Sequence, residues 1–527
     1  MVDVAIIGSG IAGLSAALEA KAKGKSVVVV SKNYPTQSQS SMAQGGINAS
    51  LDPNDSVQAH IQDTLRSSQG LASKEVVEFV CNEAPQAIAW LDSLGTPFSR
   101  KEDKIALRRL GGAKAPRACY AQDYTGLKIL HTLYDNCLKE GVEFLHERFL
   151  LNVIVEDNVA KGVTLLDIRT SQVEQLLAKA VVLATGGFGK IYGAFSTNGF
   201  GSYGEGLAAA MRAGAKLSDL EFVQFHPTAL AKSAILISEA ARGAGAKLID
   251  SSGKRFCNEL ATRDELSRAI WQKLESGEKV FLDMRELGEE FIARELPQER
   301  KLAIIYEGID PVKEPVPIRP AAHYSMGGID VDIDGKSSIK ALFACGECAN
   351  AKLHGANRLG GNSLLETVVL GRRTGGAAAE IENEVAQKEY ERTKIDRDFI
   401  KAVFGLPNQI DFMDRQEFLS KLLYNNVGII REERAMKGVL SVIRQHQREL
   451  AFMGIRDKSP LYNTELVHFL EYGNIIELAE AMVVVAIQRN ESRGAHFRKD
   501  YPEQNDAFKA HSIVWKEDGV LCADFKG

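Results

Sequence analysis

A glycine-rich turn near the N-terminus is the first segment whose spacing indicates chemistry. The order is an apolar stretch, then Gly8, Gly10 and Gly13, then helix-forming residues 14–23 and a second apolar stretch at 26–30. In such an order the first glycine suits a tight turn, the second lets the backbone approach a pyrophosphate, and the third lets the helix pack on the strand. The segment therefore predicts a dinucleotide site, with an ordinary glycine turn as the alternative.

The residues after the second apolar stretch bear on which dinucleotide binds. Ser31 and Lys32 occupy the place where NAD-binding proteins carry Asp or Glu for the ribose. A second glycine turn at Gly186 follows an apolar stretch at Ala180–Ala184. Such a second turn is typical of FAD proteins, although an ordinary strand-ending turn would look the same. We therefore expect FAD rather than a nicotinamide cofactor.

Cysteine spacing offers little support for a metal site. The chain has seven cysteines, and only Cys345 and Cys348 have CxxC spacing. A zinc or iron–sulfur site would need further ligands nearby, which the sequence does not supply. The scattered thiols also do not form a disulfide framework, so a reducing compartment is expected.

Composition excludes several classes of protein. With 527 residues, 45% hydrophobic and 25% charged, the chain is long enough for three or four globular units. The net charge of -5 offers no overall attraction to nucleic acid. The sequence shows neither an export signal nor an apolar run long enough to span a membrane. We therefore expect a cytoplasmic protein with no transmembrane segment of its own.

Long ordered motifs occur through most of the chain. They are SKNYPTQSQSSMAQGGINASL from Ser31, RLGGAKAPRACYAQDYTG from Arg109, FHPT from Phe225, SEAARGAG from Ser238, PVPIRPAAHYSMGG from Pro315, Gly346-Glu347, and HGANRLGGNSLL from His354. With these motifs the chain resembles the flavoprotein family of succinate dehydrogenase and fumarate reductase. L-aspartate oxidase belongs to the same superfamily, so the resemblance alone does not fix the substrate.

The resemblance implies an α/β fold with three parts. A Rossmann-like FAD-binding domain would comprise residues 1–221 and 323–381, and an inserted α+β capping domain would span 222–322. A C-terminal helical domain and tail would follow at 382–527, where apolar residues recur at helical spacing. The substrate would lie between the domains, where closure excludes water.

Oxidising or reducing the central bond of a C4 dicarboxylate requires a hydride carrier, donors for two carboxylates and a proton donor or acceptor. An arginine suits a carboxylate because its guanidinium can donate two parallel hydrogen bonds. The resemblance implies that the substrate is held by His226, Ser238, His323 and Arg358.

The resemblance also implies that Arg263 is the catalytic proton donor. Because the solution pKa of arginine exceeds about 12, proton delivery needs a relay, and Glu239 and Arg242 match the family's relay positions. Taken alone, Arg263 could be a surface residue paired with Asp264, and the joint occurrence of the motifs is what favours the catalytic role.

The cofactor site implied by the resemblance comes from several motifs. Glu205 stands where the family has an aspartate, one carbon shorter. The residues expected at FAD are Gly8, Gly10, Gly13, Ser31, Lys32, Ser38, Gln39, Gln44, Gly45, Gly46, Gly186, Glu205, Glu347, Ser363 and Leu364.

Gln39 departs from the pattern of the membrane-bound relatives. They usually attach FAD covalently through a histidine six positions before the first glycine of the AQGG motif, which is Gly45 here. An amide cannot form that bond, so we expect FAD to be bound non-covalently. In this family, loss of the covalent link lowers the flavin potential and is tolerated better by fumarate reduction than by succinate oxidation, so the resemblance implies that fumarate reduction is the favoured direction.

Leu110 is the second departure. L-aspartate oxidases carry a glutamate at this position, which can pair with the substrate ammonium, whereas a leucine would leave a buried ammonium unpaired. The sequence therefore favours fumarate or succinate, with L-aspartate oxidase, an enzyme of NAD biosynthesis, as the alternative. The chain has no iron–sulfur ligand set, so electrons must enter or leave FAD through something else. The resemblance implies a separate iron–sulfur subunit, with a link to a membrane or quinone-reactive subunit that would hold the protein at the cytoplasmic membrane face; the alternative is direct reoxidation by oxygen or fumarate.

Overall fold

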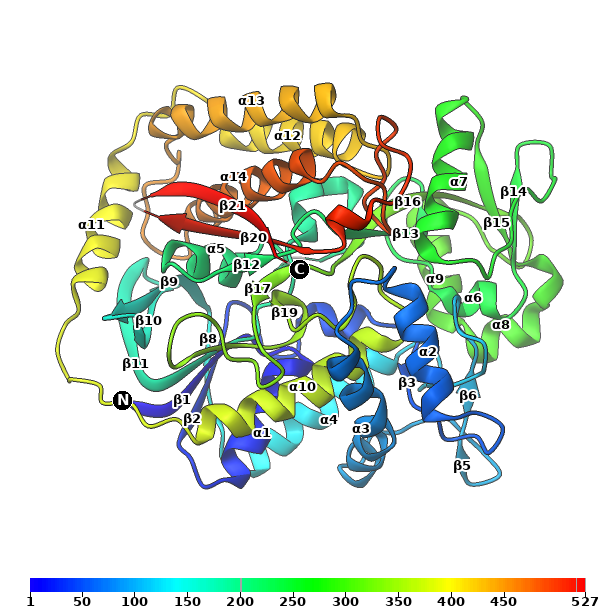
Figure 1. The fold of residues 1–527 in the computed structure, drawn as a ribbon, viewed down its shortest axis with the longest axis horizontal. Coiled ribbons are helices and arrows are strands. Elements are labelled where there is room, and N and C mark those ends of the chain that lie inside the picture. The colour runs from blue at the N-terminus through cyan, green and yellow to red at the C-terminus, as the bar shows by residue number, and fades with distance from the viewer. Residues whose placement is uncertain (200, 518, 527) are drawn as a thin grey trace.

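A mainly parallel sheet forms the centre of the structure, a computed structural model that describes residues 1–199, 201–517 and 519–526 (Figure 1). Its first two strands are buried aliphatic runs, as expected for a sheet covered on both faces. The carboxyl half of β11 lies between β1 and β18, and β2 lies between β1 and β8. The strands are β1 (Val2–Ile7), β2 (Val27–Ser31), β8 (Glu143–His146), β11 (Gln172–Leu183) and β18 (Leu342–Ala344).

Two helices pack closely against each other beside this sheet. α10 lies along α1 because its glycines leave room for the neighbouring backbone. A Cβ on Gly375 would stand 2.2 Å from the carbonyl oxygen of Ala16. Figure 1 shows further helices below the sheet. The helices of this N-terminal part are α1 (Ile11–Ala22), α2 (Val57–Ser67), α3 (Lys74–Ser93), α4 (Thr125–Lys139), α5 (Glu205–Arg212) and α10 (Asn362–Ala379).

An antiparallel extension and two small sheets complete the N-terminal part. The amino half of β11 pairs with β10, which in turn pairs with β9. One small sheet has the order β3-β7-β6, and β4 pairs with β5. These strands are β3 (Ile47–Asn48), β4 (Arg100–Lys101), β5 (Lys104–Ile105), β6 (Leu107–Arg108), β7 (Ala118–Cys119), β9 (Arg148–Glu156) and β10 (Val159–Asp167).

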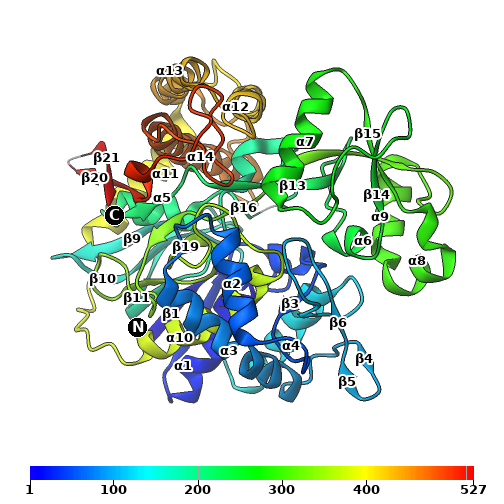
Figure 2. The same ribbon diagram turned by 45° about the vertical axis from the view of Figure 1, so that its right-hand side comes forward.

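The segment predicted to form the capping domain has an antiparallel sheet and a hydrophobic cluster of its own. Its strand order is β13-β16-β15-β14, and the last strand continues to Ser325, past the expected boundary at 322. Figure 2 shows these elements as a separate lobe. They are β13 (Val223–Leu230), α6 (Glu239–Gly243), β14 (Lys247–Asp250), α7 (Arg263–Glu275), β15 (Val280–Asp283), α8 (Glu289–Glu295), α9 (Pro297–Glu307) and β16 (Val316–Ser325).

The C-terminal part is mainly helical. The last α-helix of the described residues begins at Thr464, because the Asn463 side chain caps it by accepting a hydrogen bond from the Leu466 amide at 2.8 Å. The last two strands form a hairpin that joins a mixed sheet of order β19-β17-β12-β20-β21. These elements are α11 (Glu391–Gly405), α12 (Phe412–Asn426), α13 (Glu433–Glu449), α14 (Thr464–Gln488), β12 (Leu217–Ser218), β17 (Gly328–Asp330), β19 (Ala349–Asn350), β20 (His511–Glu517) and β21 (Val520–Lys526).

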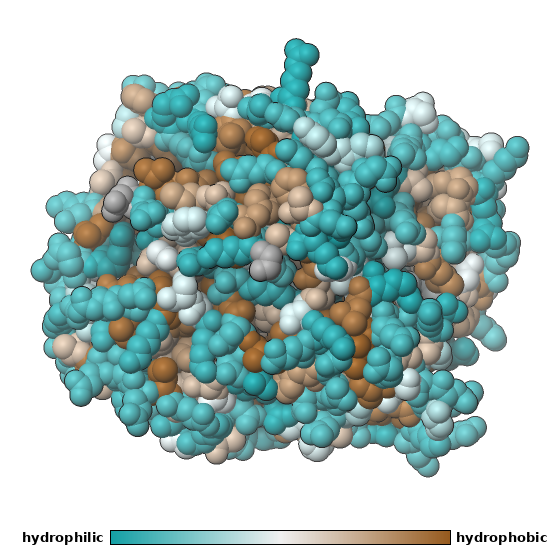
Figure 3. All heavy atoms as spheres, in the orientation of Figure 1, coloured by the Kyte–Doolittle hydropathy of each residue, from teal (hydrophilic) through white to brown (hydrophobic). Residues whose placement is uncertain are grey.

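The α/β class predicted from the sequence is confirmed. Polar residues cover most of the face in Figure 3, and hydrophobic residues there form separate patches. Within the described residues, none of the helices has the length and apolar character needed to cross a bilayer.

Candidate active site

One long cavity connects the carboxyl ends of the central strands with the capping sheet. Its lining includes residues from the glycine turn after β1, from the segment 31–46, from the capping lobe and from the start of α10. Fourteen of the fifteen residues expected at FAD line this cavity. They are Gly8, Gly10, Ser31, Lys32, Ser38, Gln39, Gln44, Gly45, Gly46, Gly186, Glu205, Glu347, Ser363 and Leu364.

The glycine turn has the geometry that its spacing indicates. Gly8 has a φ of +117°, and a Cβ there would lie 2.1 Å from the carbonyl oxygen of Ala184. Gly13, which does not line the cavity, packs instead against the turn, since its Cβ would lie 2.0 Å from the Gly8 oxygen. The amino end of α1 thus opens onto the cavity, with the Ile11 N–H donating to Ser40 Oγ at 3.1 Å.

Unpaired polar atoms indicate that the cavity suits a polar cofactor. The Gln44 side chain is 1% exposed, and neither its Nε2 nor its Oε1 has a hydrogen-bond partner in the described part of the chain. Ser38 Oγ is likewise buried and unpaired there. Buried amides and hydroxyls normally have partners. A helix amino terminus for a pyrophosphate and free donors and acceptors along the cavity therefore fit FAD.

A buried ion cluster borders the cavity at the end of β2. Lys32 Nζ donates to carboxylate oxygens of Glu205 and Glu471, at 2.7 Å for the latter. Burial opposes the charged ammonium, but the two carboxylates raise the pKa of Lys32 above its ordinary value. Glu471 belongs to α14, so this cluster ties the cofactor region to the C-terminal part.

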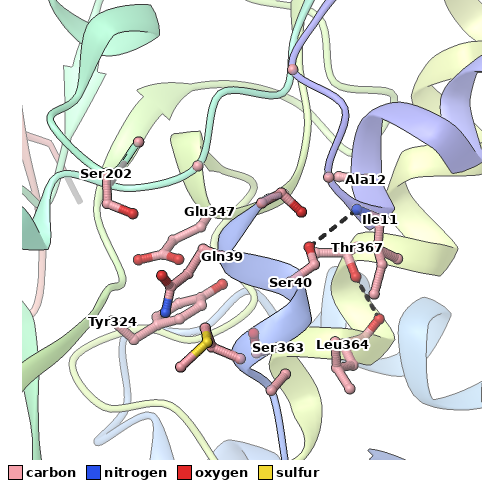
Figure 4. Close-up of a pocket in the computed structure, with 18 of the residues that line it drawn as sticks. Ile11, Ala12, Gln39, Ser40, Ser202, Tyr324, Glu347, Ser363, Leu364 and Thr367 are labelled. Atoms are coloured by element: carbon pink, nitrogen blue, oxygen red, sulfur yellow. Dashed lines mark hydrogen bonds between the residues drawn. The ribbon is translucent and has the colours of Figure 1, made fainter. Parts of the chain in front are cut away.

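Gln39, Glu347 and Tyr324 project toward the same part of the cavity (Figure 4). Gln39 Oε1 accepts a hydrogen bond from the Gly199 amide at 2.7 Å. Glu347 Oε1 accepts from the Ser325 amide at 3.0 Å, and burial raises the pKa of this carboxyl to about 7. Each of these contacts fixes a polar side chain at the cavity wall.

Arg263 lines the cavity at the amino end of α7. Its Nη2 and Nε donate to the two oxygens of Glu239 at 2.9 and 3.4 Å, and its Nη1 donates to Gln224 Oε1 at 2.9 Å. Burial would raise the pKa of Glu239, but the guanidiniums of Arg263 and Arg242 lower it below its ordinary value. The structure thus fixes Arg263 beside an ionised carboxylate.

Arg242 lies behind Glu239 and does not line the cavity. Its Nη2 donates to Glu239 Oε1 at 3.3 Å and its Nη1 to the backbone oxygen of Glu259 at 2.7 Å. Glu239 therefore stands between Arg242 and Arg263, as a relay would require.

Arg358 places another guanidinium at the same end of the cavity as Arg263. Its Nη2 donates at 3.2 Å to Gln224 Oε1, the oxygen that also accepts from Arg263. The guanidinium lies 4.2 Å from the centre of the Tyr324 ring, and its Nε has no partner among the described residues. Burial, together with Arg263, lowers the pKa of Arg358 to about 10, so it stays charged near neutral pH. Gln224 thus couples both arginines, although the sequence analysis did not single it out.

The neutral imidazoles of His226 and His323 lie next to each other, with their ring centres 5.0 Å apart. Burial and the nearby Arg263 hold both pKa values well below the ordinary value for histidine. His226 Nδ1 accepts from the Thr228 amide at 3.3 Å, so the neutral ring carries its proton on Nε2. His323 Nδ1 shares a hydrogen bond with Thr197 Oγ1 at 2.7 Å.

Ser238 lines the cavity as the N-cap of α6. Its Oγ and its amide both contact Glu299 Oε1, the amide at 3.1 Å. Glu299 itself is fully buried and lies outside the cavity lining. The sequence around Glu299 carries no motif, so only the fold could have placed it here.

The charges at this end of the cavity suit a small dianion. Arg263 and Arg242 both contact the Glu239 carboxylate, whereas Arg358 bonds to the neutral Gln224 amide and to no carboxylate among the described residues, which leaves a positive excess. Within the described residues, no cluster of His, Cys, Asp or Glu is arranged to hold a metal ion. The cavity therefore combines a cofactor region with a cationic pocket of hydrogen-bond donors.

Comparison with known proteins identifies the class to which this fold and site belong. Residues 3–364 match the model of the FAD binding domain, and residues 416–522 match that of the fumarate reductase flavoprotein C-terminus. The chain is thus an FAD-dependent oxidoreductase.

Full-length relatives define the family more closely. The chain is 36% identical to the fumarate reductase flavoprotein subunit of Haemophilus influenzae, covering 98% of this chain and 93% of that one. It is 39% identical to the 8-methylmenaquinol:fumarate reductase flavoprotein subunit of Wolinella succinogenes, covering 99% and 91%. A solved structure of the E. coli quinol fumarate reductase superposes with a TM-score of 0.94 at 34% identity, covering 100% and 96%. The chain belongs to the fumarate reductase and succinate dehydrogenase flavoprotein family.

Proposed function

We propose that the protein reduces fumarate to succinate, with Arg263 as the proton donor. The observation that carries this proposal is the arrangement of Arg263, which lines the cavity while Glu239 and Gln224 fix its guanidinium. When bound, FAD supplies the hydride. The protein must then deliver a proton to the neighbouring carbon, and Arg263 is the cavity residue with a relay behind it.

The chain's own residues would divide the remaining tasks. The Nε2–H of His226, together with His323, Ser238 and Arg358, provides donors for the substrate carboxylates. After Arg263 gives up a proton, Glu239 supplies the next one from Arg242, since it contacts both guanidiniums. Fixed donors of this kind bind the dianion and keep its carbons beside Arg263.

We further infer that FAD is bound without a covalent bond. Gln39 occupies the position of the histidine that carries the link in membrane-bound relatives, and its amide oxygen is held by the Gly199 amide. An amide side chain cannot take part in that bond. The lack of a covalent link to FAD supports fumarate reduction as the favoured direction.

Leu110 supports a dicarboxylate without an amino group. It lines the cavity, is 1% exposed, and its Cδ1 would lie 3.6 Å from a Cβ on Gly45. A substrate ammonium there would meet hydrocarbon rather than a carboxylate, which is costly. L-aspartate oxidation is therefore the weaker candidate.

The electron partner is inferred from the relatives. The Haemophilus and Wolinella proteins are both named as subunits. We infer that this chain also works in an assembly, in which a separate iron–sulfur subunit passes electrons to FAD and further subunits can hold the assembly at the cytoplasmic face of the membrane.

A paired assay on the purified, FAD-loaded chain tests the reaction. Fumarate reduction by a reduced viologen dye, with negligible peroxide release from L-aspartate in air, is the expected result. Aspartate oxidation faster than fumarate reduction would overturn the proposal and show that another group holds the ammonium.

A further inference from the structure

Glu299 is a buried carboxyl next to a residue of the proposed substrate site. It lies in the first turn of α9, is 0% exposed, and contacts the cavity residue Ser238. Its Oε2 has no hydrogen-bond partner in the described part of the chain. An ionised carboxylate in such a place would leave a charged oxygen unsolvated, which is costly, whereas a neutral acid is tolerated far better.

The charged groups that face Glu299 leave its neutral form favoured. Asp123 approaches from the N-terminal part, and its own pKa is raised by burial. The cation Arg108 is near both carboxyls but lies over the Tyr120 ring at 3.6 Å. Burial and the charge of Asp123 outweigh the hydrogen bonds from Ser238, so that the pKa of Glu299 rises to about 8.

The protonation state of Glu299 determines where the Ser238 hydroxyl can point. This hydroxyl has one hydrogen and two lone pairs. One lone pair already accepts from the Ala240 amide at 3.2 Å. If Glu299 is a neutral acid with its proton on Oε1, that proton occupies the second lone pair and the Ser238 hydrogen is free for the cavity, while Oε1 still accepts from the Ser238 amide. If Glu299 is a carboxylate, the Ser238 hydrogen must turn toward it.

We propose that Glu299 is a positioning residue for the substrate, which as a neutral acid directs the Ser238 hydroxyl into the cavity and as a carboxylate withdraws it. This inference rests on the proposed function, because it takes Ser238 as a donor to a substrate carboxylate. Ionised Glu299 also adds a negative charge beside a site for dianions. Both effects weaken dicarboxylate binding once Glu299 loses its proton.

Equilibrium binding of malonate tests the proposal without turnover, since malonate is a dicarboxylate with no CH–CH bond to oxidise. The change in flavin absorbance gives its dissociation constant between about pH 6.5 and 9. For the wild type, we expect the constant to rise by about tenfold as Glu299 ionises. Glu299→Gln cannot ionise, so the part of the rise that Glu299 causes should be absent and the constant should change much less across the range than in the wild type.

Two further variants separate positioning from a structural role. Glu307→Gln alters another buried carboxyl of α9, which accepts from the Lys232 amide away from the cavity, and it should keep the wild-type pH dependence. Ser238→Ala should bind malonate more weakly at low pH and show a smaller pH dependence.

The possible outcomes separate the role of Glu299 from the proposed function. A Glu299→Gln variant that keeps the wild-type pH dependence, or that weakens binding equally at every pH, would overturn the role of Glu299 and leave the proposed function intact. Failure of malonate, succinate and fumarate to bind the wild type at any pH would overturn both.

Discussion

Most polar side chains at the substrate end of the cavity have part of their hydrogen-bonding capacity committed within the protein. Gln224 Oε1 accepts from both Arg263 and Arg358, and Glu239 accepts from Arg263 and Arg242. These bonds leave each guanidinium few orientations, so the donors need little reordering when a substrate binds. The specificity of the site therefore depends on individual hydrogen positions as well as on charge.

Arg263→Lys should separate charge from geometry. A lysine keeps the positive charge but cannot bond both oxygens of Glu239 and Gln224 Oε1 as the planar guanidinium does. We expect dye-linked fumarate reduction to fall by about a hundredfold or more, with FAD content unchanged. Arg268→Lys is the matched control, because Arg268 pairs with Asp264 one turn further along α7. Equal activity losses in the two variants would argue against a catalytic Arg263.

The attachment of FAD has a direct readout. Because Gln39 cannot form the histidyl bond, acid precipitation of the purified protein should release all flavin into the supernatant. Absorbance of the supernatant and fluorescence of the denatured chain on a gel provide the measurement. Flavin that remained with the precipitated chain would show that a different side chain forms the link.

Secondary-structure elements differ in how far the sequence determined them. The β1–α1–β2 unit was predictable because Gly8 and Gly13 each meet a steric demand that no other residue satisfies. The approach of Gln224 to Arg358 was not, because β13 and the segment before α10 are brought together by the fold alone. The same holds for Glu299, since nothing in the sequence of α9 indicates that its first turn reaches Ser238.

Gly13→Ala should weaken the β1–α1 unit and FAD binding together. The added Cβ would stand 2.0 Å from the Gly8 oxygen, so α1 would have to move away from the turn. We expect a loss of about 2 kcal/mol or more in the free energy of unfolding, together with a lower FAD content. Gly438→Ala in α13 is the control, since nothing lies within 4 Å of its Cβ, and it should stabilise the helix slightly. Thermal unfolding and flavin absorbance would measure both effects, and normal FAD content in Gly13→Ala would contradict the packing argument.

The molecule as a whole places its site between the N-terminal part and the capping lobe, which are joined by several hydrogen bonds. The cofactor end of the cavity is built by the N-terminal part, whereas Ser238, Glu239 and Arg263 belong to the capping lobe. Asp123 of the N-terminal part accepts hydrogen bonds from the amides of Gln298 and Glu299, at 2.7 and 3.2 Å, and so caps α9 of the capping lobe. The alignment of Arg263 with the cofactor end of the cavity depends on such contacts between the lobes.

Asp123→Ala should therefore loosen the capping lobe without touching the substrate. Loss of the cap on α9 lowers the stability of the docked lobe by about 1 kcal/mol. This corresponds to about a fivefold change in the equilibrium between docked and undocked lobes. We expect the apparent dissociation constant for malonate to rise by about that factor and trypsin to cleave within residues 223–325 faster. Asp135→Ala, at an exposed position of α4, is the matched control and should change neither quantity. If Asp123→Ala kept the wild-type affinity and cleavage rate, the docked position of the lobe would be set by other contacts, such as the bond from Asn357 Nδ2 to Asp264 at 3.1 Å.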